Sequence, residues 1–230
     1  MLFSLNPLIK SGALQLSVDG VGIERVPHTK YLGVIIDDCL TWAMHISHIE
    51  KKISKSIGVI NRAKHVLNRN TLVMLYYALI YPYLSYCHLI WGKSPNVHLR
   101  KLVVLQKRVI RIITMSPFLA HTNTLFRDLE ILRVDDLYIY LCSIFIYRCL
   151  RSLYPRDFTH DPCFNPFFSR STTTRHSLYH IPYFRTTLGQ RSICYQSVKL
   201  FNEVLQPLNV FEFVQSVNQM KSFMRNLLCS

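Results

Sequence analysis

Residues 71–92 read TLVMLYYALIYPYLSYCHLIWG, and this run contains no Asp, Glu, Lys or Arg. An uncharged stretch of about 20 residues is long enough to span a bilayer or to form the buried helices of a core. Pro82 near its centre predicts a kinked or divided helix, because proline removes a helical hydrogen bond and clashes with the preceding turn. The tyrosines spread along the run suit a soluble core better than the middle of a membrane. We therefore expect the run to be the centre of a helical bundle, and a membrane span is the alternative.

Two amphipathic segments flank this run. Between 45 and 68, isoleucines recur at helical spacing along one face. The segment 98–115 repeats the layout with Leu, Val and Ile. On the opposite faces lie the candidate nucleic-acid-binding residues, which are Lys51, Lys55, Arg62, Arg69, Arg100, Lys101, Lys107, Arg108 and Arg111.

Almost all charged side chains between positions 45 and 111 are basic. Positions 45–111 contain one acid, Glu50, and twelve basic residues, namely Lys51, Lys52, Lys55, Arg62, Lys64, Arg69, Lys93, Arg100, Lys101, Lys107, Arg108 and Arg111. The formal net charge of the whole chain is +14. Because a face that only confers solubility normally mixes both signs, this composition predicts contact with nucleic-acid phosphates.

The remaining pattern predicts a mostly α fold with a small N-terminal strand unit. Residues 13–36 alternate like strands, Asp19-Gly20 marks a hairpin turn, and KYLGVII (30–36) indicates one buried strand. Asp135 and Asp136 open a helix whose middle is apolar on all sides, which predicts a central position in the core. Beyond Leu153 prolines interrupt the chain, and a terminal helix is expected near 213–228. The predicted domains are 1–44, 45–153 and 154–230.

The seven cysteines predict no disulfide framework. Their number is odd, their spacing is wide, and no C-x-x-C occurs. The N-terminal residues MLFSLNPLIK lack the features of a secretory signal. We expect reduced thiols in a cytoplasmic or nuclear protein that is not secreted.

Few residues suggest catalysis or metal binding. Asp37-Asp38 is the one pair that could imitate a polymerase metal site, and a strand end or helix cap is the competing interpretation. The histidine pairs His45/His48 and His176/His180 have spacings that could bind a metal on a helix. The first pair has no third ligand nearby and the second lies in a loop-like stretch, so surface or capping histidines are the preferred interpretation. We therefore predict no catalytic residue, no metal site and no cofactor for this chain.

Several separated motifs occur in the order of one known family. They are Tyr31-Leu32-Gly33-Val34 with Asp37, Leu40 and Trp42; Leu75-Tyr76-Tyr77; Tyr81 to Cys87 with Trp91-Gly92; Leu105 to Arg108 with Ile110-Arg111; His121-Thr122; and Thr174-Arg175 with Pro182, Arg185-Thr186, Gly189 and Ser192. In this order they resemble the C-terminal part of the reverse transcriptase of jockey-like non-LTR retrotransposons. The final family block departs here, because Leu200-Phe201-Asn202 stands where the family has Leu-Trp-Asn.

The resemblance implies roles for the predicted parts. Residues 1–44 would be the end of the palm, with Tyr31, Leu32 and Gly33 in a primer-grip-like strand. Residues 45–153 would be a thumb-like helical domain, followed by a C-terminal extension. The family's aromatic-Ala-Asp-Asp loop has no counterpart in the sequence, so the resemblance implies a truncated RNA-directed DNA polymerase without its catalytic palm.

Such a chain would not be an enzyme on its own, and Mg²⁺ would be required only by the full-length family enzyme. It would retain non-specific binding of RNA or an RNA/DNA duplex, and a separate palm-containing polypeptide is a further implied partner. Two other functions stay open at this point, namely a membrane-associated protein that spans with 71–92 and an inert translated transposon relic.

Overall fold

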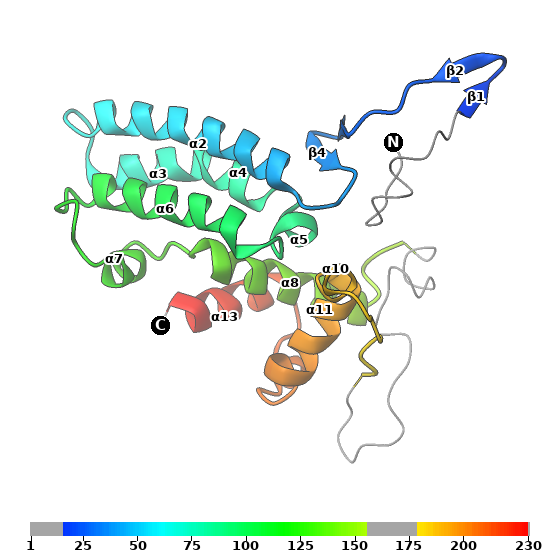
Figure 1. Cartoon of the computed structure of the whole chain (residues 1–230). Coiled ribbons are helices and arrows are strands. Elements are labelled where there is room, and N and C mark those ends of the chain that lie inside the picture. The colour runs from blue at the N-terminus through cyan, green and yellow to red at the C-terminus, as the bar shows by residue number, and fades with distance from the viewer. Residues whose placement is uncertain (1–15, 156–178, 230) are drawn as a thin grey trace.

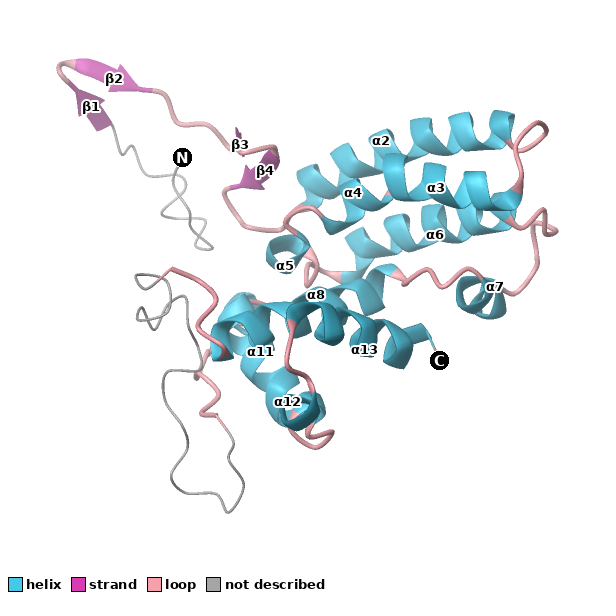
Figure 2. Cartoon of the chain, turned by 180° about the vertical axis from the view of Figure 1, so that it is seen from behind, coloured by secondary structure: helices cyan, strands magenta, loops and turns pink. Residues whose placement is uncertain are grey.

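The computed structural model describes residues 16–155 and 179–229 (Figure 1). This part of the chain is mostly α-helical, with two small antiparallel strand pairs at its N-terminal end. The expected fold class is confirmed. Figure 2 shows from behind that the helices pack together while the first strand pair extends away from them.

The strands form two separate hairpins. The first pairs β1 (Leu16–Val18) with β2 (Val21–Ile23) around the predicted turn at Asp19-Gly20. The second pairs β3 (His28–Tyr31) with β4 (Val34–Asp37). The register places Tyr31 opposite Val34, so the chain reverses between them.

The prediction of one buried strand across 30–36 is wrong. Leu32 and Gly33 form a two-residue turn in which both φ angles are positive, at 45° and 83°. This is the backbone of a type I′ hairpin turn, and Gly33 adopts it without the steric cost that a Cβ would add. The strand was predicted because the run is apolar and β-branched, and the turn signal of Gly33 within it was overlooked.

The first half of the helical bundle begins with α2 (Ala43–Ala63), which buries its isoleucines. The expected helix over 45–68 is too long by one turn. Asn68 ends the connecting segment, because its side chain accepts a hydrogen bond from the Thr71 backbone N–H at 2.9 Å and caps α3 (Arg69–Leu79). Arg69 therefore belongs to α3, and its expected alignment with the basic face of α2 is wrong.

The uncharged run is divided among three short helices, which agrees with the divided helix predicted from Pro82. They are α3, α4 (Tyr81–Ser85) and α5 (His88–Trp91). Pro82 lies in the first turn of α4, where its missing N–H has no helical partner to lose. Cys87 has a φ of 51° and turns the chain between α4 and α5. None of the helices in 16–155 and 179–229 combines the length and the apolar composition needed to cross a membrane.

The return path through α3, α4 and α5 determines how α6 (Asn96–Ile113) meets α2. The two helices lie side by side and run in the same direction (Figure 1). The helix α7 (Thr122–Asp128) then leads into α8 (Val134–Leu150).

Buried Gln106 connects these elements. Its amide nitrogen donates to the Tyr76 hydroxyl at 2.9 Å and to the Leu132 carbonyl at 2.8 Å. Its amide oxygen accepts from the Val134 N–H at 3.0 Å. One side chain therefore joins α3, α6 and the start of α8.

The C-terminal part packs around α8, which is buried on several sides as predicted. It consists of α10 (Thr187–Gln190), α11 (Ile193–Leu200), the π-helix η1 (Phe201–Leu205), α12 (Val210–Phe213) and α13 (Val217–Cys229). The expected terminal helix near 213–228 corresponds to α13. The helices α11 and α13 follow the predicted domain boundary at 153/154, yet they pack on α8, which precedes it. The division of the chain at this point therefore stays a prediction.

Candidate nucleic-acid interface

The parallel pair α2 and α6 carries most of the predicted binding residues. Near its N-terminal half, the Lys101 Nζ lies 3.5 Å from Glu50 Oε2 across the helix pair. Near the C-terminal ends, Lys64 lies with Arg108 and Arg111 around a depression of about 290 Å³. Corresponding turns of the two helices are thus in contact along their length.

The basic side chains of both helices lie on one side of this pair. Ile53 and Ile60 of α2 and Leu102 and Val109 of α6 are buried in the same core. Because the helices are parallel neighbours with a common core on one side, the faces opposite that core are turned to the same side. We call this side the α2–α6 basic surface, and it comprises Lys51, Lys55, Arg62, Arg100, Lys101, Lys107, Arg108 and Arg111.

Not every member of the surface is equally available to a ligand. Lys101 is engaged with Glu50. The Arg111 Nε donates to the Ala120 carbonyl at 3.0 Å, and its guanidinium lies 5.9 Å from the Phe118 ring centroid. The remaining members are exposed or half-buried, so they retain most of their capacity to contact phosphates.

Arg69 lies apart from the other predicted residues. Its Nη2 donates to the Asp128 carbonyl at 3.4 Å, beside α7. In contrast, Lys52 and Lys64 adjoin the surface and were not among the predicted residues. The sequence could have indicated Lys64, because every charged residue from Lys51 to Lys64 is basic and Lys64 directly follows the last residue of α2.

The primer-grip-like residues form the tip of the second hairpin. Tyr31 and Leu32 are exposed there, at 64% and 72%. The Tyr86 hydroxyl donates to the Leu32 carbonyl at 2.6 Å and fixes the tip against the helical part. Within β4, the Ile35 N–H donates to His45 Nδ1 at 3.3 Å. The hairpin is therefore attached at two points near the N-terminal end of α2.

Asp37 organises the loop between β4 and α2. Its Oδ1 accepts from the N–H groups of Cys39 at 3.2 Å and Thr41 at 2.9 Å, and its Oδ2 accepts from Trp42 at 2.7 Å. The possible ligand atoms of Asp37, Asp38 and Cys39 lie within 4.8 Å of one another. Since both carboxylate oxygens of Asp37 already accept backbone bonds, the geometry favours the strand-end interpretation over a polymerase metal site.

Two buried histidines enclose Trp91 where the hairpin meets the bundle. The ring centroids of His45 and His88 lie 5.7 Å and 4.4 Å from that of Trp91. Burial lowers the pKa of His45 to about 4, with a smaller contribution from His48. Burial also lowers the pKa of His88 to about 4. Both imidazoles are thus neutral at pH 7 and act as packing elements.

His45 and His48, the first histidine pair, have other neighbours than a shared ligand in the described part of the chain. His45 uses Nδ1 to accept from Ile35 and packs on Trp91, while His48 lies half-buried near Lys30, Lys51 and Lys52, which lower its pKa after the effect of burial. The second predicted pair, His176/His180, lies partly outside the described residues. Positive neighbours around His48 oppose binding of a cation.

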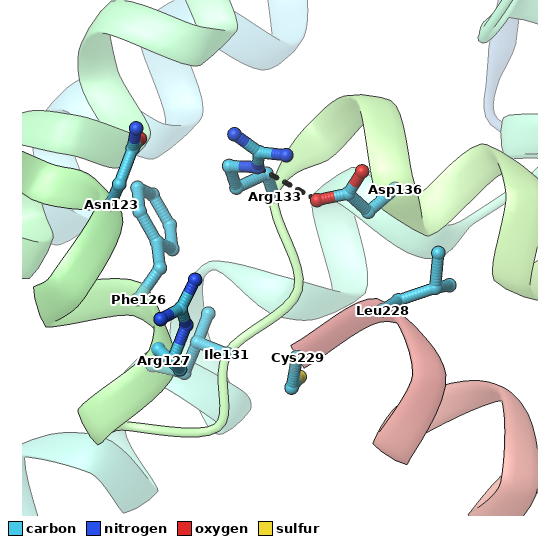
Figure 3. A pocket seen from close by; sticks show the side chains of 8 residues that line it. All are labelled: Asn123, Phe126, Arg127, Ile131, Arg133, Asp136, Leu228 and Cys229. Atoms are coloured by element: carbon cyan, nitrogen blue, oxygen red, sulfur yellow. Dashed lines mark hydrogen bonds and ion pairs between the residues drawn. The ribbon is translucent and has the colours of Figure 1, made fainter.

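A separate pocket of about 200 Å³ lies between α7, α8 and α13 (Figure 3). Arg133 Nε donates to Asp136 Oδ2 at 2.7 Å beside it, which pairs these two charges. Burial raises the pKa of the Cys229 thiol, so that sulfur remains protonated and is a poor nucleophile. This pocket therefore offers neither an activated nucleophile nor a one-sign charge.

Comparison with known proteins finds relatives of one kind, the RNA-directed DNA polymerases of mobile elements. The chain is 28% identical over 124 residues to the RNA-directed DNA polymerase from mobile element jockey of Drosophila funebris, which covers 53% of this chain and 14% of that relative. It is 29% identical over 126 residues to the probable RNA-directed DNA polymerase from transposon X-element of Drosophila melanogaster, covering 50% of this chain and 14% of that relative.

A third relative is the probable RNA-directed DNA polymerase from transposon BS of Drosophila melanogaster, at 27% identity over 127 residues, with 53% of this chain and 14% of the relative covered. No protein-family model and no solved structure matches the chain. The matches span about one seventh of the length of the relatives. The chain is related to the reverse transcriptases of jockey-like non-LTR retrotransposons.

Proposed function

We propose that the α2–α6 basic surface binds the phosphate backbone of RNA or an RNA/DNA duplex without sequence preference. The observation that supports this most is the parallel packing of two basic helices. Helical periodicity and the core that the two helices share turn their charged faces to the same side. Lys and Arg side chains on such a surface neutralise phosphates and release counterions, which provides affinity but carries no base information.

The names of the relatives support a more specific proposal, a role in reverse transcription. Three of them are named as RNA-directed DNA polymerases of mobile elements. We infer that this chain supplies the part that holds template and primer, with the hairpin tip at Tyr31, Leu32 and Gly33 as a primer-grip-like element. A separate polypeptide that carries the catalytic palm is the partner this role requires. A membrane-spanning function has no supporting observation.

Charge reversal tests the surface. We expect the triple variant Lys51→Glu, Lys55→Glu, Arg62→Glu, and likewise Arg100→Glu, Lys107→Glu, Arg108→Glu, to bind duplex at least about tenfold more weakly at low salt. Each phosphate contact that is lost should lower the slope of log affinity against log salt by roughly 0.9 on duplex DNA. Fluorescence anisotropy across a salt series measures both quantities.

The second triple variant uses Arg108 instead of Arg111, because Arg111 also bonds to Ala120 and its loss would disturb a loop. A matched control reverses Arg127, Arg185 and Lys221, which lie outside the surface and change the net charge equally. If the control loses as much affinity as the surface variants, only net charge matters. If the surface variants bind as well as the parent, the surface is an ordinary solvated face and the proposed function fails.

We expect no primer extension by this chain alone with Mg²⁺ or Mn²⁺. Phosphoryl transfer by two metal ions needs several carboxylates that converge on the ions. Asp37 is occupied by three backbone N–H groups, which leaves Asp38 as the nearest other carboxylate in this loop. Extension with a labelled primer on an RNA template is the measurement. Robust extension that Asp38→Asn abolishes would show that this reasoning is wrong.

A further inference from the structure

A second pocket lies at the N-terminus of α6, beside the start of α8. Its volume is about 460 Å³, and its lining includes Lys93, Ser94, Asp135, Tyr138 and Arg191. The first N–H groups of an α-helix have no partner within the helix. Pro95 occupies the N-cap position, and no side chain caps α6 there. The N–H groups of His98 and Leu99 donate to the Pro95 carbonyl, so the backbone donors that the first turn leaves at the pocket are those of Asn96 and Val97, both of which line it.

Two buried hydroxyl groups in the lining have no partner. Ser94 is 5% exposed and Tyr138 is 3% exposed. Within 16–155 and 179–229, neither Ser94 Oγ nor Tyr138 Oη has a hydrogen-bond partner. Buried polar groups are almost always paired, so two orphaned hydroxyls in one pocket indicate a ligand that supplies acceptor atoms.

The charged groups of the pocket favour an anion. Lys93 Nζ lies 4.6 Å from the centroid of the Tyr138 ring, and Arg191 reaches the pocket from the segment between α10 and α11. Burial raises the pKa of Tyr138 well above its usual range, so its phenol keeps the proton and can donate. Asp135 is the single acid of the lining, it is exposed, and it lies in the first turn of α8.

We propose that this pocket binds a phosphate group. The backbone N–H groups of Asn96 and Val97, the two hydroxyls, the ammonium and the guanidinium are all donors, and a phosphate offers only acceptors. This inference goes beyond the proposed function, because it rests on the pocket and not on the α2–α6 basic surface. The phosphate group belongs either to a nucleic-acid backbone or to a small phosphate compound, and the experiment distinguishes these two sources.

Thermal unfolding of the full chain in sodium phosphate, with sodium chloride adjusted to a constant ionic strength, is the first arm. We expect a saturable rise in Tm with phosphate. Lys93→Gln and Arg191→Gln should each weaken the apparent affinity about tenfold, because each removes a charge-assisted hydrogen bond. Asp135→Asn should strengthen it. Lys221→Gln, which removes a cation of α13 outside both the pocket and the α2–α6 basic surface, is the matched control and should leave it unchanged.

Conservative variants separate binding from folding. Ser94→Ala and Tyr138→Phe remove the orphaned hydroxyls and should leave the Tm without phosphate unchanged or higher. They should nevertheless weaken phosphate binding several-fold. A variant that lowers the Tm without phosphate and retains the full phosphate response would contradict the proposal, because the hydroxyl would then serve folding alone.

The second arm measures the affinity of a duplex oligonucleotide in the same variants. A response to sodium phosphate identifies a site for small phosphates. No response to sodium phosphate, with duplex binding weakened by Arg191→Gln, identifies a backbone phosphate as the ligand. If phosphate is no better than chloride and duplex affinity is unchanged in Arg191→Gln, the proposal is overturned. Reversal of Lys51, Lys55 and Arg62 should not change the phosphate response, so failure of the surface and of the pocket are distinguishable.

Discussion

Lowering the pH from 7 to 5 is expected to reduce the free energy of unfolding by about 4 kcal/mol, chiefly through His45 and His88. The pKa of each is about 4 in the folded chain, whereas the ordinary histidine pKa in the unfolded chain is about 6.5. Between these values the unfolded chain binds the proton and the folded chain does not. Stability is therefore fully present above pH 6.5 and is lost as the pH falls toward 4, at about 1.4 kcal/mol per pH unit for each histidine.

Urea unfolding at pH 7, 6 and 5 measures this loss. His45→Gln and His88→Gln should each remove about half of the pH dependence, although both should lower stability at pH 7. The exposed His65 provides the control, because His65→Gln should leave the pH dependence intact. An equal loss of stability between pH 7 and 5 in the parent and in both buried-histidine variants would assign the effect to other groups.

Replacing Gln106 by Met should destabilise the chain by about 4 kcal/mol. Methionine has a similar volume, so the change removes hydrogen bonds while the packing is largely kept. The Val134 N–H, the Leu132 carbonyl and the Tyr76 hydroxyl would each lose a partner in a buried place. An unsatisfied buried group costs about 1–3 kcal/mol, which makes the joint loss large.

Tyr76→Phe is the matched variant for this network. It removes one of the three bonds and leaves the other two, so it should cost about 1 kcal/mol. The double variant should cost less than the sum of the two single changes, because the Gln106 variant has already broken the bond that Tyr76→Phe removes. Urea unfolding at pH 7.5 measures all three, and a Gln106→Met cost below that of Tyr76→Phe would contradict the network.

The sequence pattern predicted the surface and the core of the bundle because both follow from helical periodicity. The isoleucines of α2 and the basic residues opposite them repeat at the spacing that a helix requires. Gln106 was named only as part of a family motif and was missed as a core residue, because polar side chains seldom occupy buried positions. Its position on the helix was informative, since Leu102 and Val109 lie on the same face and are buried.

Other features depended on single residues or on the path of the chain. Asn68 ended one helix and capped the next, and Gly33 turned an apparent strand into a hairpin. The parallel packing of α2 and α6 could not be read from periodicity, because it depends on a return path that Pro82 and the positive φ of Cys87 direct. The pocket at the N-terminus of α6 was missed for the same reason, as Arg191 reaches it from far along the chain.

The parallel arrangement of α2 and α6 also adds their helix dipoles. Each helix carries about half a positive charge at its N-terminus and half a negative charge at its C-terminus. Arg62 and Arg111 stand in the last turns, so part of their charge offsets the combined negative pole. The electric field of the surface is therefore strongest toward the N-terminal ends of the two helices. A bound polyanion should be held most tightly near Arg100, in the first turns of α6, and more loosely where the helices end.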